Sequence, residues 1–376
     1  MNMNEQMKES EESILHTYNR FPVVFEKGQG CYLYDSEGKE YLDFAAGIAV
    51  NSLGYHYPGY DEALKDQIDK LMHISNLYYN EPIIEAGAKL VKASKMSKAF
   101  FTNSGTEAIE GALKAAKKYA YVRDGHADHE IIAMNHSFHG RSIGALSVTG
   151  TAHYREPFEP LMGGVKFADF NDLESVKAQI TDKTCAIITE VVQGEGGIYP
   201  AKKEFLEGLR QICDEKDIML IFDEIQCGMG RTGHYFAWQA YGVQPDIMTS
   251  AKALGCGVPV GAFVLNEKAA KASLEPGDHG TTYGGNPFVC AAVSKVFDIY
   301  ENDKIIEHVQ EMTPYLEQKL DEIVAKHECA ATRRGMGFMQ GIVIQGRPVG
   351  EVVKAALAKG LLVISAGSCL LYTSPS

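Results

Sequence analysis

Three adjoining stretches decide the fold: TCAIITEVV (184–192), KKEFLEGLRQICDEKD (202–217) and IMLIFDEI (218–225). The first and third are short, almost continuous apolar runs, while the second spaces its apolar residues as one face of a helix does. Strands without polar alternation are typical of parallel sheets that helices cover on both faces. The three stretches therefore predict a strand–helix–strand unit of an α/β protein.

The same alternation extends in both directions along the chain. Its further strands are predicted at 98–104, 130–135, 164–170, 246–252 and 261–266, with helices at 105–120 and 173–180. These elements predict a mostly parallel sheet with helices on both faces. After about residue 286, two long helices lead into a smaller α+β unit, and the hairpin-like start of the chain is expected to join it. We therefore predict a large domain over 51–290 and a small domain built from 1–50 and 291–376.

Composition excludes several classes of protein. The 376 residues are 45% hydrophobic and carry a net charge of −13, which argues against binding to nucleic-acid phosphates and against a polybasic membrane anchor. No apolar run is long enough to cross a bilayer, and the polar N-terminus does not resemble a signal peptide. The eight scattered cysteines form no Cys-x-x-Cys pair, so we expect no zinc site and a reducing cytoplasm.

Polar groups follow several of the apolar strands, at the edge where open α/β sheets bind ligands. After one of these strands a helix begins, at Ser104, Gly105 and Thr106. The free N–H groups at the start of a helix can bind an anion. The same residues are also typical of an ordinary N-cap, which binds nothing. Asp223 ends a buried strand, where a carboxylate needs a cationic or hydrogen-bonding partner. Lys252 lies among apolar residues and glycines. By itself, this position is typical of a lysine at a strand end with its ammonium in water. Together with other reactive groups at the same edge, it favours an amine nucleophile.

The segment NHSFHGRS (135–142) adds an aromatic ring and a guanidinium. Phe138 can stack on a heterocycle, and Arg141 can grip a carboxylate. The histidines of this region, here and upstream, match no standard zinc spacing and have no carboxylate cluster in the sequence, so we expect no metal. The glycines of CGMGRTG (227–233) imitate a dinucleotide fingerprint, but no helix pattern follows them, so we interpret them as a loop.

Together, these residues offer a phosphate site, an aromatic ring for stacking, a buried acid and an amine. Pyridoxal phosphate has a matching phosphate, aromatic ring, basic ring nitrogen and aldehyde. At this point the sequence closely resembles the class III pyridoxal-phosphate-dependent aminotransferases, over residues 18–368. The motifs that carry the resemblance are GKEYLDFAAGIAV, HISNLYYNEP, FTNSGTEAIEGALK, SFHGRS, VQGEGG, FDEIQCGMGRTG, PDIMTSAKAL and HGTTYGGNP. The resemblance implies the fold-type I architecture of aspartate aminotransferase, with a large sheet domain and a small α+β domain built from both termini. It also implies a homodimer.

The resemblance assigns cofactor roles to residues of this chain. Lys252 would bind the cofactor covalently and later move a proton, and Asp223 would pair with the ring nitrogen so that the ring acts as an electron sink. Gln226 would contact the ring hydroxyl oxygen, and Phe138 would stack on the ring.

Phosphate and substrate contacts follow in the same way. Gly105 and Thr106 would hold the phosphate, and Thr282 would add a phosphate contact from the partner subunit. Arg141 would bind a substrate carboxylate, with Thr281 nearby.

The reaction implied is a two-step transfer. The δ-amino group of N2-acetylornithine would pass to the cofactor, leaving N-acetylglutamate 5-semialdehyde, and then to 2-oxoglutarate, giving glutamate, as in arginine biosynthesis. Other ω-aminotransferases of the class (ornithine, succinylornithine, 4-aminobutyrate or lysine type) share the cofactor residues and remain alternatives. A class III racemase or decarboxylating enzyme, a nicotinamide-dependent dehydrogenase and an inactive remnant are more distant ones.

The end of the chain departs from the family. Glu195, in VQGEGG, resembles a glutamate that pairs with a second, carboxylate-binding arginine, but no arginine follows Arg347. We interpret the closing CLLYTSPS (369–376) as a sequencing or assembly artefact on a truncated gene. We expect it to leave the small domain incomplete and to weaken its core.

Overall fold

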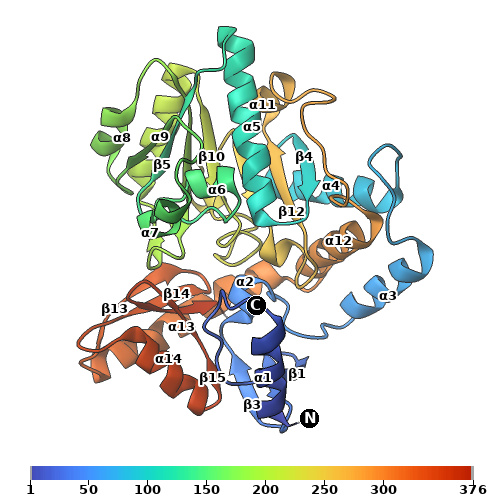
Figure 1. Ribbon diagram of the computed structural model, residues 1–376, viewed down its shortest axis with the longest axis vertical. Coiled ribbons are helices and arrows are strands. Elements are labelled where there is room, and N and C mark those ends of the chain that lie inside the picture. Colours follow the sequence, from blue (N-terminus) through green and yellow to red (C-terminus); the bar gives the residue numbers. More distant parts are fainter. Residues whose placement is uncertain (1, 374–376) are drawn as a thin grey trace.

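The computed structural model describes residues 2–373, and a seven-stranded sheet forms its centre (Figure 1). The order of its strands is β4 (Lys98–Thr102), β12 (Gly261–Leu265), β11 (Ile247–Ser250), β10 (Met219–Asp223), β7 (Thr184–Glu190), β5 (Glu130–Met134) and β6 (Val165–Ala168). Six strands run parallel, whereas β12 is antiparallel to both of its neighbours. The expectation of a mostly parallel sheet is confirmed.

Helices cover both faces of this sheet, as Figure 1 shows. The helices of this region are α5 (Gly105–Asp124), α6 (Ile143–Ser147), α7 (Ala152–Arg155), α8 (Leu173–Gln179), α9 (Lys203–Lys216), α10 (Trp238–Tyr241) and α11 (Glu267–Lys271), with 3₁₀ turns η1 (Glu156–Phe158) and η2 (Lys252–Leu254). On one face, Ile188 and Ile221 pack with α5 residues such as Leu113. On the other, Leu220 packs with α9 residues such as Phe205. Alternate residues of each central strand therefore serve two cores, which is why these strands are apolar throughout.

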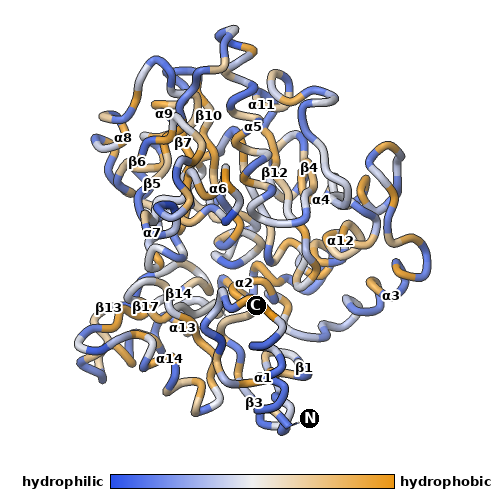
Figure 2. Tube along the Cα trace, viewed as in Figure 1, coloured by the Kyte–Doolittle hydropathy of each residue, from blue (hydrophilic) through white to orange (hydrophobic). Residues whose placement is uncertain are grey.

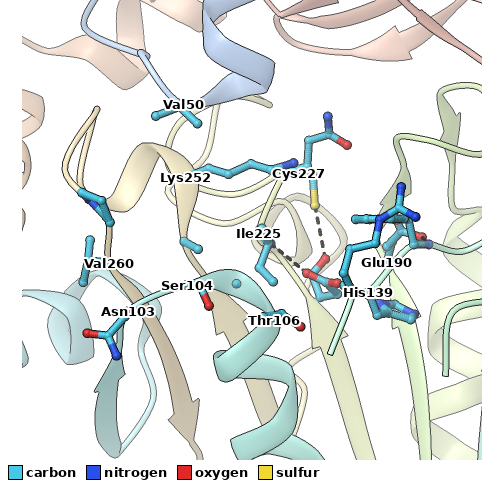
Figure 3. Close-up of a pocket in the computed structure, with 18 of the residues that line it drawn as sticks. Val50, Asn103, Ser104, Thr106, His139, Glu190, Ile225, Cys227, Lys252 and Val260 are labelled. Carbon is cyan, nitrogen blue, oxygen red and sulfur yellow. Dashed lines mark hydrogen bonds and ion pairs between the residues drawn. The ribbon is translucent and has the colours of Figure 1, made fainter. Parts of the chain in front are cut away.

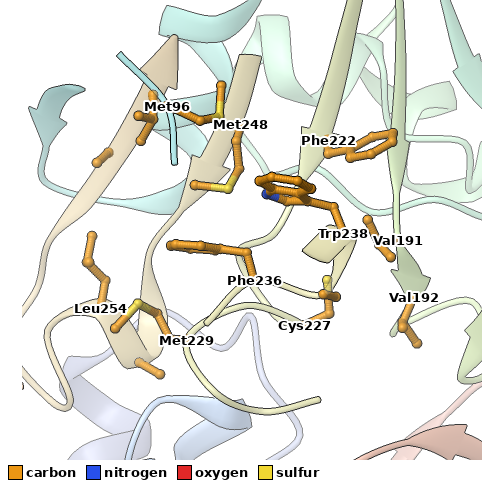
Figure 4. Close-up of a cluster of buried hydrophobic side chains, with 14 of the residues drawn as sticks. Met96, Val191, Val192, Phe222, Cys227, Met229, Phe236, Trp238, Met248 and Leu254 are labelled. Carbon is orange, nitrogen blue, oxygen red and sulfur yellow. The ribbon is translucent and has the colours of Figure 1, made fainter. Parts of the chain in front are cut away.

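The second core also takes in the segments that precede and follow the sheet. Trp238 belongs to this core together with Phe222 of β10 and Met248 of β11, and Figure 4 shows these three side chains. The apolar character of the central strands is visible in Figure 2. Around it lie α3 (Tyr60–Lys70), α4 (Glu81–Ser94) and α12 (Pro287–Asn302), of which α12 packs on both α3 and α4. Helix α12 thus connects α3 and α4 to this core.

The remaining elements form smaller sheets from both ends of the chain (Figure 1). One sheet has the order β1 (Phe25–Gln29), β2 (Tyr32–Asp35), β3 (Glu40–Asp43) and β15 (Leu361–Leu362). Another has β13 (Ala330–Met336), β14 (Met339–Ile344), β17 (Cys369–Thr373) and β16 (Ile364–Ala366), and a ribbon pairs β8 (Val192–Gln193) with β9 (Tyr199–Pro200). The helices of this part are α1 (Met3–Ser13), α2 (Ala46–Ala49), α13 (Ile305–Lys326) and α14 (Val349–Ala358).

Segments from the two ends of the chain meet where β3 pairs in parallel with β15, with Leu42 opposite Leu361. The domain limits near 50 and 290 stay a prediction. Near the end of the described residues, Cys369 and Leu370 are buried, and Leu370 packs in the cluster that α13 and α14 cover. Residues 374–376 lie outside the described residues. No helix among residues 2–373 has both the length and the apolar character that a membrane span requires.

Several boundaries differ from the sequence-based expectation. The run 184–192 is not one strand, because β7 ends at Glu190 and Val192 pairs instead with Pro200 in the separate ribbon. The run 218–225 ends its strand at Asp223, and the helix that begins at Gly105 continues to Asp124. The two earlier strand ends place the polar side chains of Glu190 and Asp223 next to the site described below.

Candidate active site

A cavity of about 510 Å³ lies beyond the carboxyl ends of β7, β10 and β11. The structure brings seven of the ten residues that the sequence singled out into its wall, namely Gly105, Thr106, Phe138, Arg141, Asp223, Gln226 and Lys252. These residues come from four separate segments of the chain. The shared edge of the parallel strands is what collects them.

Lys252 reaches into this cavity from η2, between Val50 and Ile225 in Figure 3. Its backbone has a φ of +49°, a left-handed conformation that a lysine rarely adopts and that clusters at functional sites. Burial lowers the pKa of its ammonium, and the nearby carboxyls of Asp223 and Glu195 act in the opposite direction. The lower pKa makes the neutral, nucleophilic amine more accessible near neutral pH.

Asp223 ends β10 and is almost fully buried. Its Oδ1 accepts hydrogen bonds from the Ile225 N–H at 3.0 Å and the Thr249 hydroxyl at 3.2 Å. Its Oδ2 lies 2.7 Å from Nδ1 of the buried His139. Because a carboxylate oxygen accepts, Nδ1 must carry the proton, and the second lone pair of Oδ2 is left for a ligand. The arrangement suits an ionised carboxylate facing a cationic ring nitrogen.

The start of α5 forms the anion-binding side of the cavity. Ser104 is the N-cap, and its hydroxyl accepts from the Glu107 N–H, so the N–H groups of Gly105 and Thr106 precede the first helical hydrogen bond. The Thr106 hydroxyl shares a 2.7 Å hydrogen bond with Ser142. Unpaired N–H groups at the start of a helix, together with hydroxyls, form a phosphate site.

Gln226 supplies an unused donor. Its Nε2 is buried without a hydrogen-bond partner among the described residues. Its Oε1 packs so closely on Gly194 that a Cβ there would lie 1.7 Å away, so any other residue at 194 would force the Gln226 side chain to move. A buried amide N–H without an acceptor is costly unless a ligand oxygen supplies one.

Phe138 and Arg141 lie at the mouth of the cavity. Phe138 is half-buried, and the exposed Arg141 guanidinium lies 4.1 Å from the ring centre of Tyr154 and 5.3 Å from that of Phe138. Among residues 2–373, no carboxylate lies within ion-pair distance of Arg141. Its fork of donors is open to a carboxylate from solution.

The other three singled-out residues do not line this cavity. Thr282 is exposed, and Thr281 accepts from the Asn103 side chain at 3.2 Å, which places it beside the cavity wall. Glu195 is half-buried and close enough to Lys252 to influence its pKa. Their predicted roles remain predictions.

Sequence reasoning missed two buried residues of this site. The sequence motifs indicate only a loop histidine at 139 and assign no role to Glu190, yet both residues line the cavity beside Asp223. The signal available for Glu190 was its place at the end of an apolar strand, like Asp223. No local pattern indicates the partner of His139, because His139 and Asp223 are 84 residues apart.

Two other expectations can be compared with the structure. The glycines of 227–233 lie in turns with no helix after them until α10, which confirms the loop interpretation. The upstream histidines do have a carboxylate neighbour. A carboxylate oxygen of Asp124 and ring nitrogens of His126 and His129 all lie within 4.8 Å of one another. The Asp124 carboxylate already pairs with the Arg123 guanidinium at 2.6 Å.

The residues present fit pyridoxal phosphate. The unpaired Gln226 amide would donate to the ring oxygen, and Asp223 would pair with the ring nitrogen. The start of α5 would bind the phosphate, and Lys252 would react with the aldehyde. The fold and this donor set define a pyridoxal-phosphate-dependent enzyme of fold-type I.

Comparison with known proteins gives the family. Residues 14–376 match the aminotransferase class-III family, and the chain belongs to it. Acetylornithine aminotransferase of Clostridium acetobutylicum is 48% identical, over 97% of this chain and 94% of the relative, and succinylornithine transaminase of Yersinia pseudotuberculosis is 44% identical, over 97% and 90%. Ornithine aminotransferase of Toxoplasma gondii superposes with a TM-score of 0.95 at 28% identity, over 100% of this chain and 89% of that one, and its structure has pyridoxal phosphate at partial occupancy. The chain is thus a pyridoxal-phosphate-dependent aminotransferase.

Proposed function

We propose that this enzyme transfers the δ-amino group of N2-acetylornithine to 2-oxoglutarate, giving N-acetylglutamate 5-semialdehyde and glutamate, as in arginine biosynthesis. The similarity to acetylornithine aminotransferase over nearly the full length of both chains supports this choice of donor. The observation that carries it is the open Arg141 guanidinium at the mouth of a cavity that has Lys252 in its wall. A donor with a carboxylate at one end and an amine at the other fits such a pair.

Each residue has a separate task in this proposal. When bound, the cofactor supplies an aldehyde and an electron-withdrawing ring. The Asp223 carboxylate, oriented by His139, holds a proton at the ring nitrogen, and the Gln226 amide donates to the ring oxygen. The Lys252 amine moves the proton at the substrate carbon that bears nitrogen, for which its lowered pKa suits it. Arg141 orients the substrate through its carboxylate.

A homodimer is part of the proposal. A cluster of large apolar side chains is exposed on one protomer, with Leu77 at 87%, Tyr79 at 94%, Ile84 at 60% and Tyr283 at 62%. Apolar surface of this kind is typical of interfaces. Thr282 is next to Tyr283, so a second copy covering this cluster would bring Thr282 toward the partner's cofactor phosphate. Thr281 and Glu195 are proposed as further contacts to the substrates.

We also propose a cytoplasmic location. All eight cysteines are without disulfide partners, which fits a reducing compartment. The substrates we propose are small molecules, and we infer no nucleic-acid or membrane partner.

The donor is tested by absorbance. The full chain is loaded with pyridoxal phosphate, and N2-acetylornithine, N2-succinylornithine, ornithine or 4-aminobutyrate is added without an oxo acid. We expect N2-acetylornithine to convert the lysine-bound cofactor to its amine form with the highest second-order rate constant for this half-reaction. A higher value with another donor would replace the assignment by that donor, and conversion by none would refute it.

The role of Arg141 is tested by replacing it with alanine. Losing a charge-assisted contact of about 1.5–3 kcal/mol should raise KM for N2-acetylornithine about 10- to 100-fold. Arg347→Ala is the matched control, because Arg347 is exposed and does not line the cavity. A KM for Arg141→Ala equal to that of the control would mean that another group binds the carboxylate.

A further inference from the structure

Glu190 is a second buried carboxyl beside Asp223. It ends β7, and its Cα is the register partner of Asp223 on the neighbouring parallel strand, so the two side chains lie on the same side of the sheet. Both line the cavity, and they are only 5% and 4% exposed. Two carboxyls therefore share one site that is largely closed to water.

The two carboxyls differ in the number and length of the hydrogen bonds that they accept. Asp223 has the His139 ring at 2.7 Å and two further donors within 3.2 Å. Glu190 has two backbone N–H groups at longer distances, that of Phe138 at 3.4 Å and that of Gly194 at 3.3 Å. Among residues 2–373, no lysine, arginine or histidine forms an ion pair with Glu190. Only Asp223 has the close donors that a buried negative charge requires.

Other titratable groups also face this part of the cavity. His139 is engaged by Asp223, and Arg141 lies at the exposed mouth over Tyr154. Burial lowers the pKa of Lys252, which favours its neutral form, and raises that of the Cys227 thiol well above its usual range. Glu195, half-buried, lies near Lys252. None of these groups supplies Glu190 with a paired positive charge.

We infer that Glu190 is held as an uncharged carboxylic acid beside the ionised Asp223, so that the carboxyl pair carries a single negative charge, located on Asp223. Two buried carboxyls in adjacent register cannot both ionise without mutual repulsion. Burial first, and then the charge of Asp223, raises the pKa of Glu190 well above its ordinary value, in agreement with this geometry. Glu190 is then a positioning residue that leaves Asp223 as the one anion for the ring nitrogen.

The charge state can be read by infrared spectroscopy on the full chain loaded with pyridoxal phosphate. At pH 7.5, the difference between wild type and Glu190→Gln should show the loss of a protonated carboxylic acid band. Loss of a carboxylate band would overturn the inference. Glu267→Gln is the matched control, because the exposed Glu267 pairs with Lys271, which lowers its pKa, and its loss must remove carboxylate absorbance. The spectrum is independent of which amine is the substrate, so this test and that of the donor can fail separately.

Stability gives a second readout. An acid with a raised folded-state pKa binds more protons in the folded than in the unfolded chain, so its contribution is full below the unfolded pKa of about 4.5 and is lost as pH rises toward the folded pKa. The unfolding constant of wild type relative to Glu190→Gln should therefore rise by up to about tenfold per pH unit in that window. Parallel curves would refute the inference.

A further variant keeps the inference testable if Glu190→Gln does not fold. In Asp223→Asn, the like charge beside Glu190 is absent. The acid band should then convert to carboxylate at a lower pH than in wild type. An unchanged midpoint would show that the two carboxyls are not coupled.

Discussion

His139→Ala tests whether the hydrogen bond behind Asp223 serves cofactor binding. The His139 side chain is fully buried, and its Nδ1–H is the closest donor to Asp223, at 2.7 Å from Oδ2. The remaining donors, from Ile225 and Thr249, both reach Oδ1. Removing His139 therefore leaves Oδ2 without a protein donor among the described residues.

The size of the effect follows from that contact. A hydrogen bond to a charged group contributes about 1.5–3 kcal/mol, and about 1.4 kcal/mol corresponds to a factor of ten. Without the donor, the carboxylate that faces the ring nitrogen is no longer held in place by a hydrogen bond to Oδ2. We expect the dissociation constant of pyridoxal phosphate to rise about 10- to 100-fold, measured by absorbance titration of the apoprotein.

Two further variants separate this role from simple packing. His139→Asn retains a side-chain N–H and should recover part of the affinity, whereas a purely structural role predicts no such rescue. His136→Ala, in the same segment but exposed, should change the dissociation constant by no more than about twofold. If His139→Ala binds the cofactor as tightly as His136→Ala does, the reasoning is wrong.

The remaining predictions concern the nucleophile, a buried acid and the core. Lys252→Ala should fold, by circular dichroism, but borohydride should trap no cofactor on it by mass spectrometry; a trapped adduct would assign the amine elsewhere. Burial raises the pKa of Glu224 from 4.5 to about 7, so wild type should lose about 3 kcal/mol of stability from this group as pH rises through that range, a slope that Glu224→Gln should flatten in denaturant titrations. A Cβ on Gly111 would lie 2.2 Å from the Phe263 ring, so Gly111→Ala should cost about 1–3 kcal/mol in thermal unfolding, whereas Gly350→Ala, with open space in α14, should not destabilise.

The sequence by itself determined the α/β class and most of the candidate residues that line the cavity. Continuous apolar runs between amphipathic helices are a local pattern, and they require a parallel sheet that is buried on both faces. Once the strands are known, the edge at which their carboxyl ends meet is also known, and Asp223 and Lys252 are found there. The resemblance to a family then supplied roles that chemistry alone left open, as for Gln226.

The tertiary structure alone decided how neighbouring strands and loops meet. The antiparallel direction of β12, and the pairing of β3 with β15 from the other end of the chain, depend on contacts that no local pattern specifies. The same holds for the contact of His139 with Asp223 and for the register that sets Glu190 beside it. Periodicity along a chain fixes which face of a strand is buried, but register between strands is set by packing between residues far apart in sequence. The placing of two buried carboxyls side by side in this site is decided at that second level.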